Sequence, residues 1–239
     1  MGESVELQAQ VDANTKPSRY KSNARIVGIL YVIGTLAGIL SVPFLAVRNE
    51  PNYLVKIAEN PNLLVAGAIL TLVMGFALAL IPVFMFPVLK KHSEVAGIGY
   101  LIFRSALETC TYLISAVCAV ALASLGAAYA AGTQDAGSLQ GAGTALKAIA
   151  DSSVGAFVFG TGALILYTAL YKYQLIPRWI SAFGIVAVLL HVASDGLMLF
   201  GLQEAFDTGS LAMNLPIAVQ EMLMAVWLII KGFYVTETE

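Results

Sequence analysis

Six long stretches of mostly apolar residues occupy most of this chain, and each is long enough to cross a lipid bilayer. A transmembrane helix needs about 20 consecutive apolar residues. The stretches run over 25–47, 63–89, 95–124, 152–171, 178–200 and 212–233. They are continuous and lack the alternating segments of about ten residues that are typical of outer-membrane strands. We therefore predict an all-α fold, a polytopic membrane bundle of six transmembrane helices.

The composition agrees with a protein whose surface faces the lipid bilayer. Of the 239 residues, 59% are hydrophobic and 12% are charged, whereas soluble domains are about half apolar and about a quarter charged. The formal net charge is −2 and the basic residues form no single face, so we expect no nucleic-acid partner. The two cysteines, Cys110 and Cys118, lie in one predicted helix, too far apart for a disulfide. No cluster of Cys and His residues is present, so neither a metal site nor a cofactor is expected.

Lys and Arg residues gather on one side of the predicted spans, and this sets the orientation. Basic residues in short loops are retained on the cytoplasmic side. Nine lie at the two ends and in alternate connections: Lys16, Arg19, Lys21, Arg25, Lys90, Lys91, Lys172, Arg178 and Lys231. Three lie on the other side: Arg48, Lys56 and Lys147. We predict that both termini are cytoplasmic and that the protein is a multi-pass protein of the inner (plasma) membrane.

The segments outside the spans are short or polar. Residues 1–24 are polar and lack an apolar core, which predicts a disordered cytoplasmic tail. Residues 234–239 form a short cytoplasmic tail. The outer connection from about 125 to 151 is rich in Gly, Ala, Ser and Thr, which indicates a flexible or partly helical surface segment.

Ionisable side chains occur inside the apolar stretches, where lipid offers them no water. They are Arg104, Glu108, His191, Asp195 and Glu221. A charge at the bilayer centre costs at least ~2.5–3.5 kcal/mol, so these residues should face the bundle interior or a water-filled cavity. The third stretch supports this, because one helical face carries Tyr100, Arg104, Glu108, Thr111 and Ser115. Asn214 continues the face of Glu221 outward. These five residues and Asn214 are the candidates for binding a ligand or a proton.

The depth of each residue divides the candidates into two groups. At about 1.5 Å per residue, Arg104 and Glu108 lie roughly 10–20 Å from the cytoplasmic end, and His191 and Asp195 lie roughly 18–25 Å from it. Glu221 falls near the midplane. Arg104, Glu108 and Glu221 are therefore a midplane charge cluster, while His191 and Asp195 are an outer pair that can reach water.

The polar residues allow a structural and a functional interpretation. Arg104 paired with Glu108 or Glu221 can lock helices together, as buried ion pairs sometimes specify an arrangement. The same residues can line a cavity for an ion, a proton or a small polar ligand. His191 and Asp195, four residues apart, suit a proton relay or a general base. An enzyme is disfavoured, because no Ser- or Cys-centred motif accompanies them and no catalytic residue is identified.

Small residues and prolines predict where helices approach closely or bend. Small residues recur every four positions, a pattern that lets helices in lipid pack closely. They are Gly34 and Gly38, then Gly67, Thr71 and Gly75, then Ser152, Ala156 and Gly160. Pro82 and Pro87 remove backbone hydrogen bonds in the second stretch and predict a kink there.

Three parts of the chain resemble a known family of bacterial membrane proteins, domain of unknown function 4386. The parts are 24–31 (ARIVGILY), 176–181 (IPRWIS), and 214–222 (NLPIAVQEM) with 225–233 (AVWLIIKGF). The resemblance extends over about 24–233. It implies a bacterial inner-membrane protein with six spans, and it carries no established activity or catalytic residues. It also places Glu221 within a family motif.

Two functions follow from these observations. The first is a small helical bundle with a polar site at mid-depth that binds or transports a small solute, a lipid headgroup or a proton. The alternative is a structural or regulatory membrane subunit whose buried charges clamp helices or engage a partner. An intramembrane hydrolase ranks third. The sequence leaves the ligand, the oligomeric state and any membrane partner open.

Overall fold

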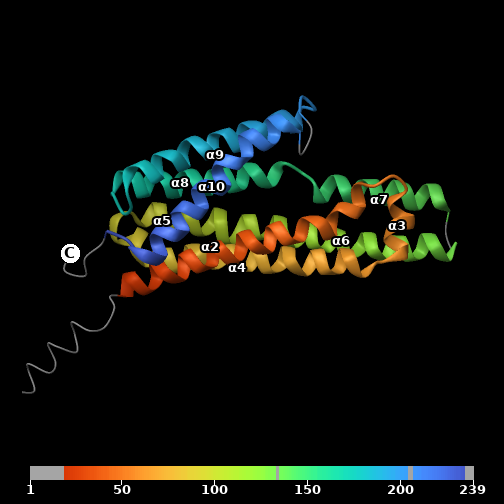
Figure 1. Ribbon diagram of the computed structural model, residues 1–239, viewed down its shortest axis with the longest axis horizontal. Coiled ribbons are helices and arrows are strands. Elements are labelled where there is room, and N and C mark those ends of the chain that lie inside the picture. Colours follow the sequence, from red (N-terminus) through yellow and green to blue (C-terminus); the bar gives the residue numbers. More distant parts are fainter. Residues whose placement is uncertain (1–18, 133–134, 204–206, 235–239) are drawn as a thin grey trace, which may run out of the picture.

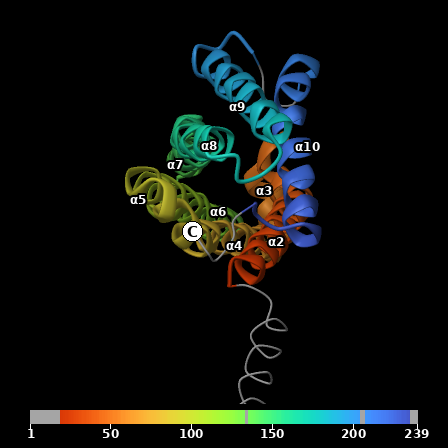
Figure 2. The same cartoon turned by 90° about the vertical axis from the view of Figure 1, so that its left-hand side faces the viewer.

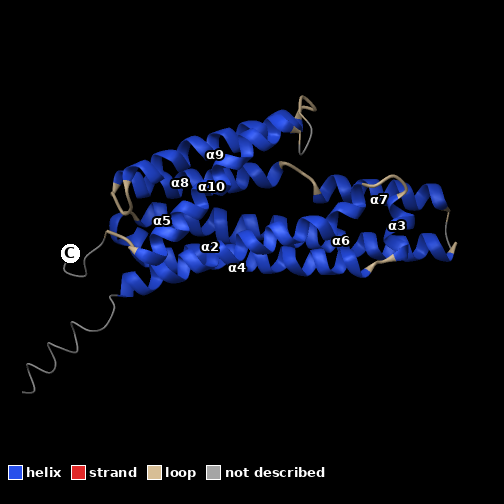
Figure 3. Cartoon of the chain, in the orientation of Figure 1, coloured by secondary structure: helices blue, strands red, loops and turns tan. Residues whose placement is uncertain are grey.

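The computed structural model describes residues 19–132, 135–203 and 207–234. Most of these residues are helical. These residues contain no strand (Figure 3). The helices are α2 (Arg19–Leu45), α3 (Tyr53–Glu59), α4 (Asn62–His92), α5 (Glu94–Tyr100), α6 (Glu108–Ala131), α7 (Ala136–Ala150), α8 (Val154–Lys172), α9 (Arg178–Leu199) and α10 (Thr208–Ile230). A 3₁₀ turn, η1 (Ala46–Asn49), follows α2, and a π-helical segment, η2 (Leu101–Leu107), joins α5 to α6. The predicted all-α fold is confirmed.

Six helical stretches within the described residues are long and apolar enough to cross a membrane. They are Tyr20–Asn49, Asn62–His92, Glu94–Ala131, Ala136–Lys172, Arg178–Leu199 and Thr208–Ile230. Large apolar side chains such as Ile39, Val117 and Leu215 lie exposed on the outside of the bundle, where lipid would cover them. The prediction of six spans is confirmed, and the cytoplasmic placement of the termini stays a prediction.

The spans form a ring in chain order. α2 packs along α4, α4 packs along η2 and α6, and α8 packs on α5 and η2. α9 packs on α8, and α10 closes the ring by packing on both α9 and α2 (Figure 2). The buried charged residues of the spans, Arg104 and Glu108, lie inside this ring.

The two ends of the bundle are filled differently. The largest core cluster lies at the end that holds the start of α2 and the end of α10, and it includes three fully buried tyrosines, Tyr31, Tyr100 and Tyr167. The hydroxyls of Tyr31 and Tyr100 lie 3.2 Å apart and share a hydrogen bond. At the opposite end, α3 and α7 lie beyond the ends of α8, α9 and α10 (Figure 1). A smaller apolar cluster around Ile57 and Leu122 holds that end together.

Small residues lie at the closest helix contacts. A Cβ atom added to Gly34 or Gly38 would come within 2.8 Å of Leu78 or Met74 on α4. A Cβ atom at Gly160 would meet Val192 on α9 at 2.3 Å. The small-residue pattern therefore marks real contacts between spans, which larger side chains would force apart.

Two segments outside the predicted spans are more helical than the sequence suggested. Residues 19–24 of the predicted disordered tail belong to α2, while residues 1–18 and 235–239 lie outside the described residues. In the outer connection, α6 continues to Ala131 and α7 occupies most of the rest. Asp135 caps α7 by accepting hydrogen bonds from the backbone N–H and the hydroxyl of Ser138, and these bonds lower the pKa of Asp135 below its ordinary value. Alanines favour helix strongly enough to outweigh the glycines here.

Candidate functional site

Arg104 forms a buried ion-pair cluster with carboxylates from two parts of the chain. Its Nη1 donates to Oε1 and Oε2 of Glu108 at 2.9 and 3.0 Å, and its Nη2 donates to Oε1 of Glu221 at 3.2 Å. The Arg104 and Glu108 side chains are 3% and 2% exposed, and that of Glu221 is 15% exposed. We call Arg104, Glu108 and Glu221 the arginine clamp. The three residues that depth assigned to one midplane cluster are in contact.

Two aromatic side chains complete the surroundings of the clamp. The Tyr112 hydroxyl donates to Glu108 Oε1 at 2.7 Å. The Phe159 ring, on α8, lies 4.8 Å from the Arg104 guanidinium carbon, a cation–π contact. Neither aromatic residue was among the predicted site residues. Tyr112 could have been found, because it follows Glu108 by four residues and so lies on the same helical face. Phe159 carried no such signal, since only the packing of α8 against η2 brings it there.

The clamp is built on an irregular part of its helix. Arg104 lies in the π-helical segment η2, and Glu108 begins α6. Within η2, the Ser105 hydroxyl donates to the Ala79 carbonyl of α4 at 2.5 Å, close to Pro82. A π-helical turn is uncommon and is frequently found at functional sites. The sequence predicts a regular helix here and not a π-helical turn.

α4 itself runs through both prolines as one helix. Pro82 and Pro87 lie inside α4. Asn23, on α2, donates through Nδ2 to the Phe84 carbonyl at 3.0 Å. The Ala79 and Phe84 carbonyls that these two bonds reach each follow by one residue the carbonyls of Leu78 and Val83, which Pro82 and Pro87 leave without a helical donor.

A second polar group surrounds His191. Its Nδ1 is hydrogen-bonded to Asn214 Oδ1 and lies 3.4 Å from Asp195 Oδ2. Asn214 donates through Nδ2 to the Ser210 carbonyl at 2.9 Å and to the Ser194 hydroxyl at 3.2 Å. We call His191, Ser194, Asp195 and Asn214 the histidine network. Asn214 thus joins the outer pair.

The hydrogen bonds assign the tautomer of His191. The Asn214 amide nitrogen must face the Ser210 carbonyl, which only accepts, so its oxygen faces His191. Both neighbours of Nδ1 are then acceptors, and Nδ1 carries a proton.

A cavity of about 350 Å³ joins the two groups. Its wall includes Glu108 of the clamp and His191 and Asp195 of the network. The remaining polar side chains of the wall are Ser41, Thr71, Thr111, Tyr112, Ser115, Asp151, Ser152 and Ser153. We call this space the polar cavity. Arg104, Glu221 and Asn214 are not among its wall residues. Arg104, which also bonds to Glu221, is hydrogen-bonded to the wall residue Glu108, and Asn214 is hydrogen-bonded to the wall residue His191. The depth of each residue along its helix predicted two separate groups, and one cavity borders both. The cavity can do so because its wall from Glu108 to Ser115 extends about 10 Å along the helix, at the rise of an α-helix.

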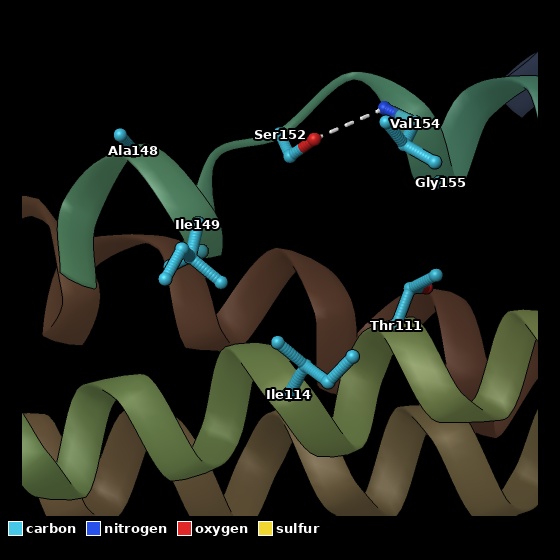
Figure 4. Close-up of a pocket in the computed structure, with 8 residues that line it drawn as sticks. Thr111, Ile114, Ala148, Ile149, Ser152, Val154 and Gly155 are labelled. Carbon is cyan, nitrogen blue, oxygen red and sulfur yellow. Dashed lines mark hydrogen bonds between the residues drawn. The ribbon is translucent and has the colours of Figure 1, made fainter. Parts of the chain in front are cut away.

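A second space opens beside the polar cavity, between α6 and the junction of α7 with α8. It has a volume of about 450 Å³. Thr111 and Ile114 point from α6 toward Ile149 and Gly155 on the facing chain (Figure 4). The wall also contains Ala148, Ala150, Ser152 and Val154. The Val154 N–H donates to the Ser152 hydroxyl at 3.4 Å within the junction. We call this space the side pocket.

The described residues, 19–132, 135–203 and 207–234, contain no group of three or more His, Cys, Asp or Glu side chains that could hold a metal ion.

The fold and the buried polar groups define a class, the multi-pass membrane bundle of six helices with a polar interior. The chain belongs to the family described as Domain of unknown function (DUF4386), whose sequence profile matches residues 26–232. This is the family that the three quoted segments resemble. No curated protein matches the chain, and no solved structure matches it.

Proposed function

We propose that this membrane protein binds a small, positively charged solute in the polar cavity. The observation that carries the proposal is the shared wall, in which Glu108 and Asp195 line one cavity together with His191. Intramembrane carboxylates are costly to bury, and a charged group in such a place usually has a functional partner. A cationic solute would provide that partner.

The balance of charge favours a cation over an anion. Three acidic residues line the polar cavity, Glu108, Asp151 and Asp195, and none of its described wall residues is Lys or Arg. Arg48 neutralises Asp151 through an ion pair. Arg104 is shared between two carboxylates, so the clamp keeps a formal negative charge. Asp195 adds another.

Acceptor atoms remain for a ligand to use. A carboxylate can accept about four hydrogen bonds. Glu108 accepts two through Oε1 and one through Oε2. Asp195 Oδ2 is buried and makes no hydrogen bond, although His191 lies nearby. A buried acceptor without a partner destabilises a fold by about 1–3 kcal/mol, and an ammonium group would remove that penalty.

The polar cavity is lined by residues 151–153, which connect α7 to α8, and this connection lies away from the start of α2 and the end of α10 (Figure 1). The distribution of Lys and Arg favours cytoplasmic termini in a bacterial inner membrane. We therefore propose that the solute reaches the site from the extracytoplasmic side.

The proposal is tested by titrating the purified protein with methylammonium chloride, with sodium chloride at equal ionic strength as the reference. We expect a saturable rise in the melting temperature with methylammonium alone. Asp195→Asn should weaken the apparent affinity about tenfold, since it removes one charge-assisted hydrogen bond. The matched control is Glu59→Gln, an exposed carboxyl on α3. The absence of a saturable response in the native protein, or an equal response in Asp195→Asn, contradicts the proposal.

A second candidate is a structural bundle in which the arginine clamp only holds helices together. The observation in its favour is that Arg104 bonds both to Glu108, at the start of α6, and to Glu221, on α10. Glu221 lies 117 residues after Arg104 in the chain. Co-purification of a stoichiometric membrane partner would favour this candidate, and a saturable methylammonium response that depends on Asp195 would favour the first.

A further inference from the structure

The polar cavity and the side pocket adjoin each other. Their walls share Thr111, Ala150, Ser152 and Gly155. The Thr111 hydroxyl donates to the Glu108 carbonyl at 2.7 Å, so its proton is not available to a ligand. A molecule bound in the polar cavity would meet the side pocket where these four residues border both spaces.

The side pocket differs in chemistry from the polar cavity. Its largest side chains are apolar, Ile114, Ile149 and Val154, and about half of each is exposed. They belong to helical stretches that are apolar enough to cross a membrane. The side pocket lies where α7 ends at Ala150 and α8 begins at Val154, and Figure 4 shows this non-helical connection across from Thr111 and Ile114. Because the half-exposed apolar side chains of the side pocket lie in membrane-spanning stretches, the hydrocarbon of a bilayer would meet them.

We infer that the ligand is a single-chain cationic amphiphile, with its ammonium headgroup in the polar cavity and its alkyl chain in the side pocket. The inference rests on the proposed cation site and adds an alkyl chain that enters from the bilayer, while a small soluble cation still enters from the extracytoplasmic side. The acidic wall selects the headgroup, because Glu108 and Asp195 attract a cation and repel an anion. The chain leaves lipid for a pocket that is equally apolar, so the side pocket provides access from the bilayer more than affinity.

A photo-crosslinking experiment tests the inference on the full chain in lipid nanodiscs. The probe is dodecylammonium with a diazirine on its chain, and mass spectrometry maps the labelled peptides. We expect labelling in the peptides that contain Ile114 and 148–155. Unlabelled dodecylammonium should compete, and dodecyl sulfate, which has the same chain and the opposite charge, should not.

Two variants separate the chain from the headgroup. Val154→Trp fills the side pocket and should reduce the labelling about tenfold, because the indole takes the space that the chain of the probe would occupy. The soluble methylammonium response should remain. Val117→Trp is the matched control, since Val117 lies on α6, is exposed, and lines neither space. It should leave the labelling unchanged.

The outcomes distinguish the two proposals. Labelling spread over all lipid-facing helices, or labelling that Val154→Trp leaves unchanged, overturns the amphiphile while the methylammonium response still supports a small-cation site. Loss of labelling together with the absence of any methylammonium response in the native protein overturns both. Labelling that follows Val154 and Asp195 supports both.

Discussion

The arginine clamp and the histidine network lie at the same cavity, yet they differ in how tightly they are held. Arg104 and Glu108 are almost completely buried and are joined by two hydrogen bonds, with a third from Tyr112. His191 and Asp195 are 22% and 14% exposed. Asp195 Oδ2 makes no hydrogen bond. Three hydrogen bonds between charged groups hold the clamp, although Arg104 Nε is buried without a partner, whereas no hydrogen bond reaches Asp195 Oδ2.

This difference teaches how one bundle can combine a rigid part with an adaptable one. A buried ion pair with charge-assisted hydrogen bonds has a high energetic cost for any rearrangement in a medium of low polarity. A partly exposed pair with an unpartnered acceptor can bind a ligand without breaking such bonds. We expect variants of the clamp to change stability and variants of the network to change binding.

The largest effect is expected for Arg104→Ala. This change leaves Glu108 and Glu221 buried without their cation, which should lower the free energy of unfolding by about 3–5 kcal/mol. The measurement is unfolding in mixed micelles by titration with sodium dodecyl sulfate. Arg48→Ala is the control, because its ion pair with the half-exposed Asp151 should contribute at most about 1 kcal/mol. Equal losses in the two variants would show that the clamp is not the stabilising element.

A neutral replacement of the whole clamp should recover much of that loss. In the triple variant Arg104→Met, Glu108→Gln, Glu221→Gln, no buried charge is left without a partner. Replacing a buried ion pair with neutral groups of similar size is often close to neutral, so the triple variant should be more stable than Arg104→Ala by about 2 kcal/mol. The same titration measures it. A triple variant that is less stable than Arg104→Ala would mean that each polar group contributes separately.

Tyr112→Phe should have an intermediate effect on stability. It removes the hydrogen bond to Glu108 Oε1 and keeps the ring, which should lower the free energy of unfolding by about 1 kcal/mol. Tyr171→Phe, on the exposed side of α8, is the matched control and should change stability by less than about 0.5 kcal/mol. If the two changes have the same effect, the Tyr112 hydroxyl does not support the clamp.

The smallest effect on stability is expected for Asp195→Asn. Asp195 Oδ2 makes no hydrogen bond, so the free energy of unfolding should change by less than about 0.5 kcal/mol. Binding of methylammonium, measured by calorimetry, should nevertheless weaken. A large loss of stability with unchanged binding would assign Asp195 to the rigid part of the molecule and remove the contrast between the two regions.

Much of the fold could be predicted, because each span carries its own signal. The length of the apolar stretches predicted the six spans. The spacing of Gly34 and Gly38 predicted a close helix contact, which the structure shows to be the contact of α2 with α4. The extent of α7 was not predicted, since its glycines favour a loop and its cap at Asp135 was not considered. The π-helical turn at Arg104 was also missed, because its residues are compatible with an ordinary helix.

The individual residues of the candidate site could be predicted from the sequence, but not which of them line the same cavity. The cost of burying charge in lipid singled out Arg104, Glu108, His191, Asp195 and Glu221 from the sequence alone. Depth along each helix then separated two groups that a single cavity joins, since depth carries no information about which helices are neighbours. Asn214 continues the face of Glu221, and only the structure shows that it is hydrogen-bonded to His191.

The sequence by itself determined that this chain is a membrane bundle with polar residues in its interior, because hydrophobic length and the cost of buried charge are local properties. Only the tertiary structure decided that the six spans close into a ring, that Arg104 meets Glu221 across it, and that an apolar pocket adjoins the acidic cavity. These features depend on the contact between residues far apart in the chain, which packing sets and local sequence does not encode.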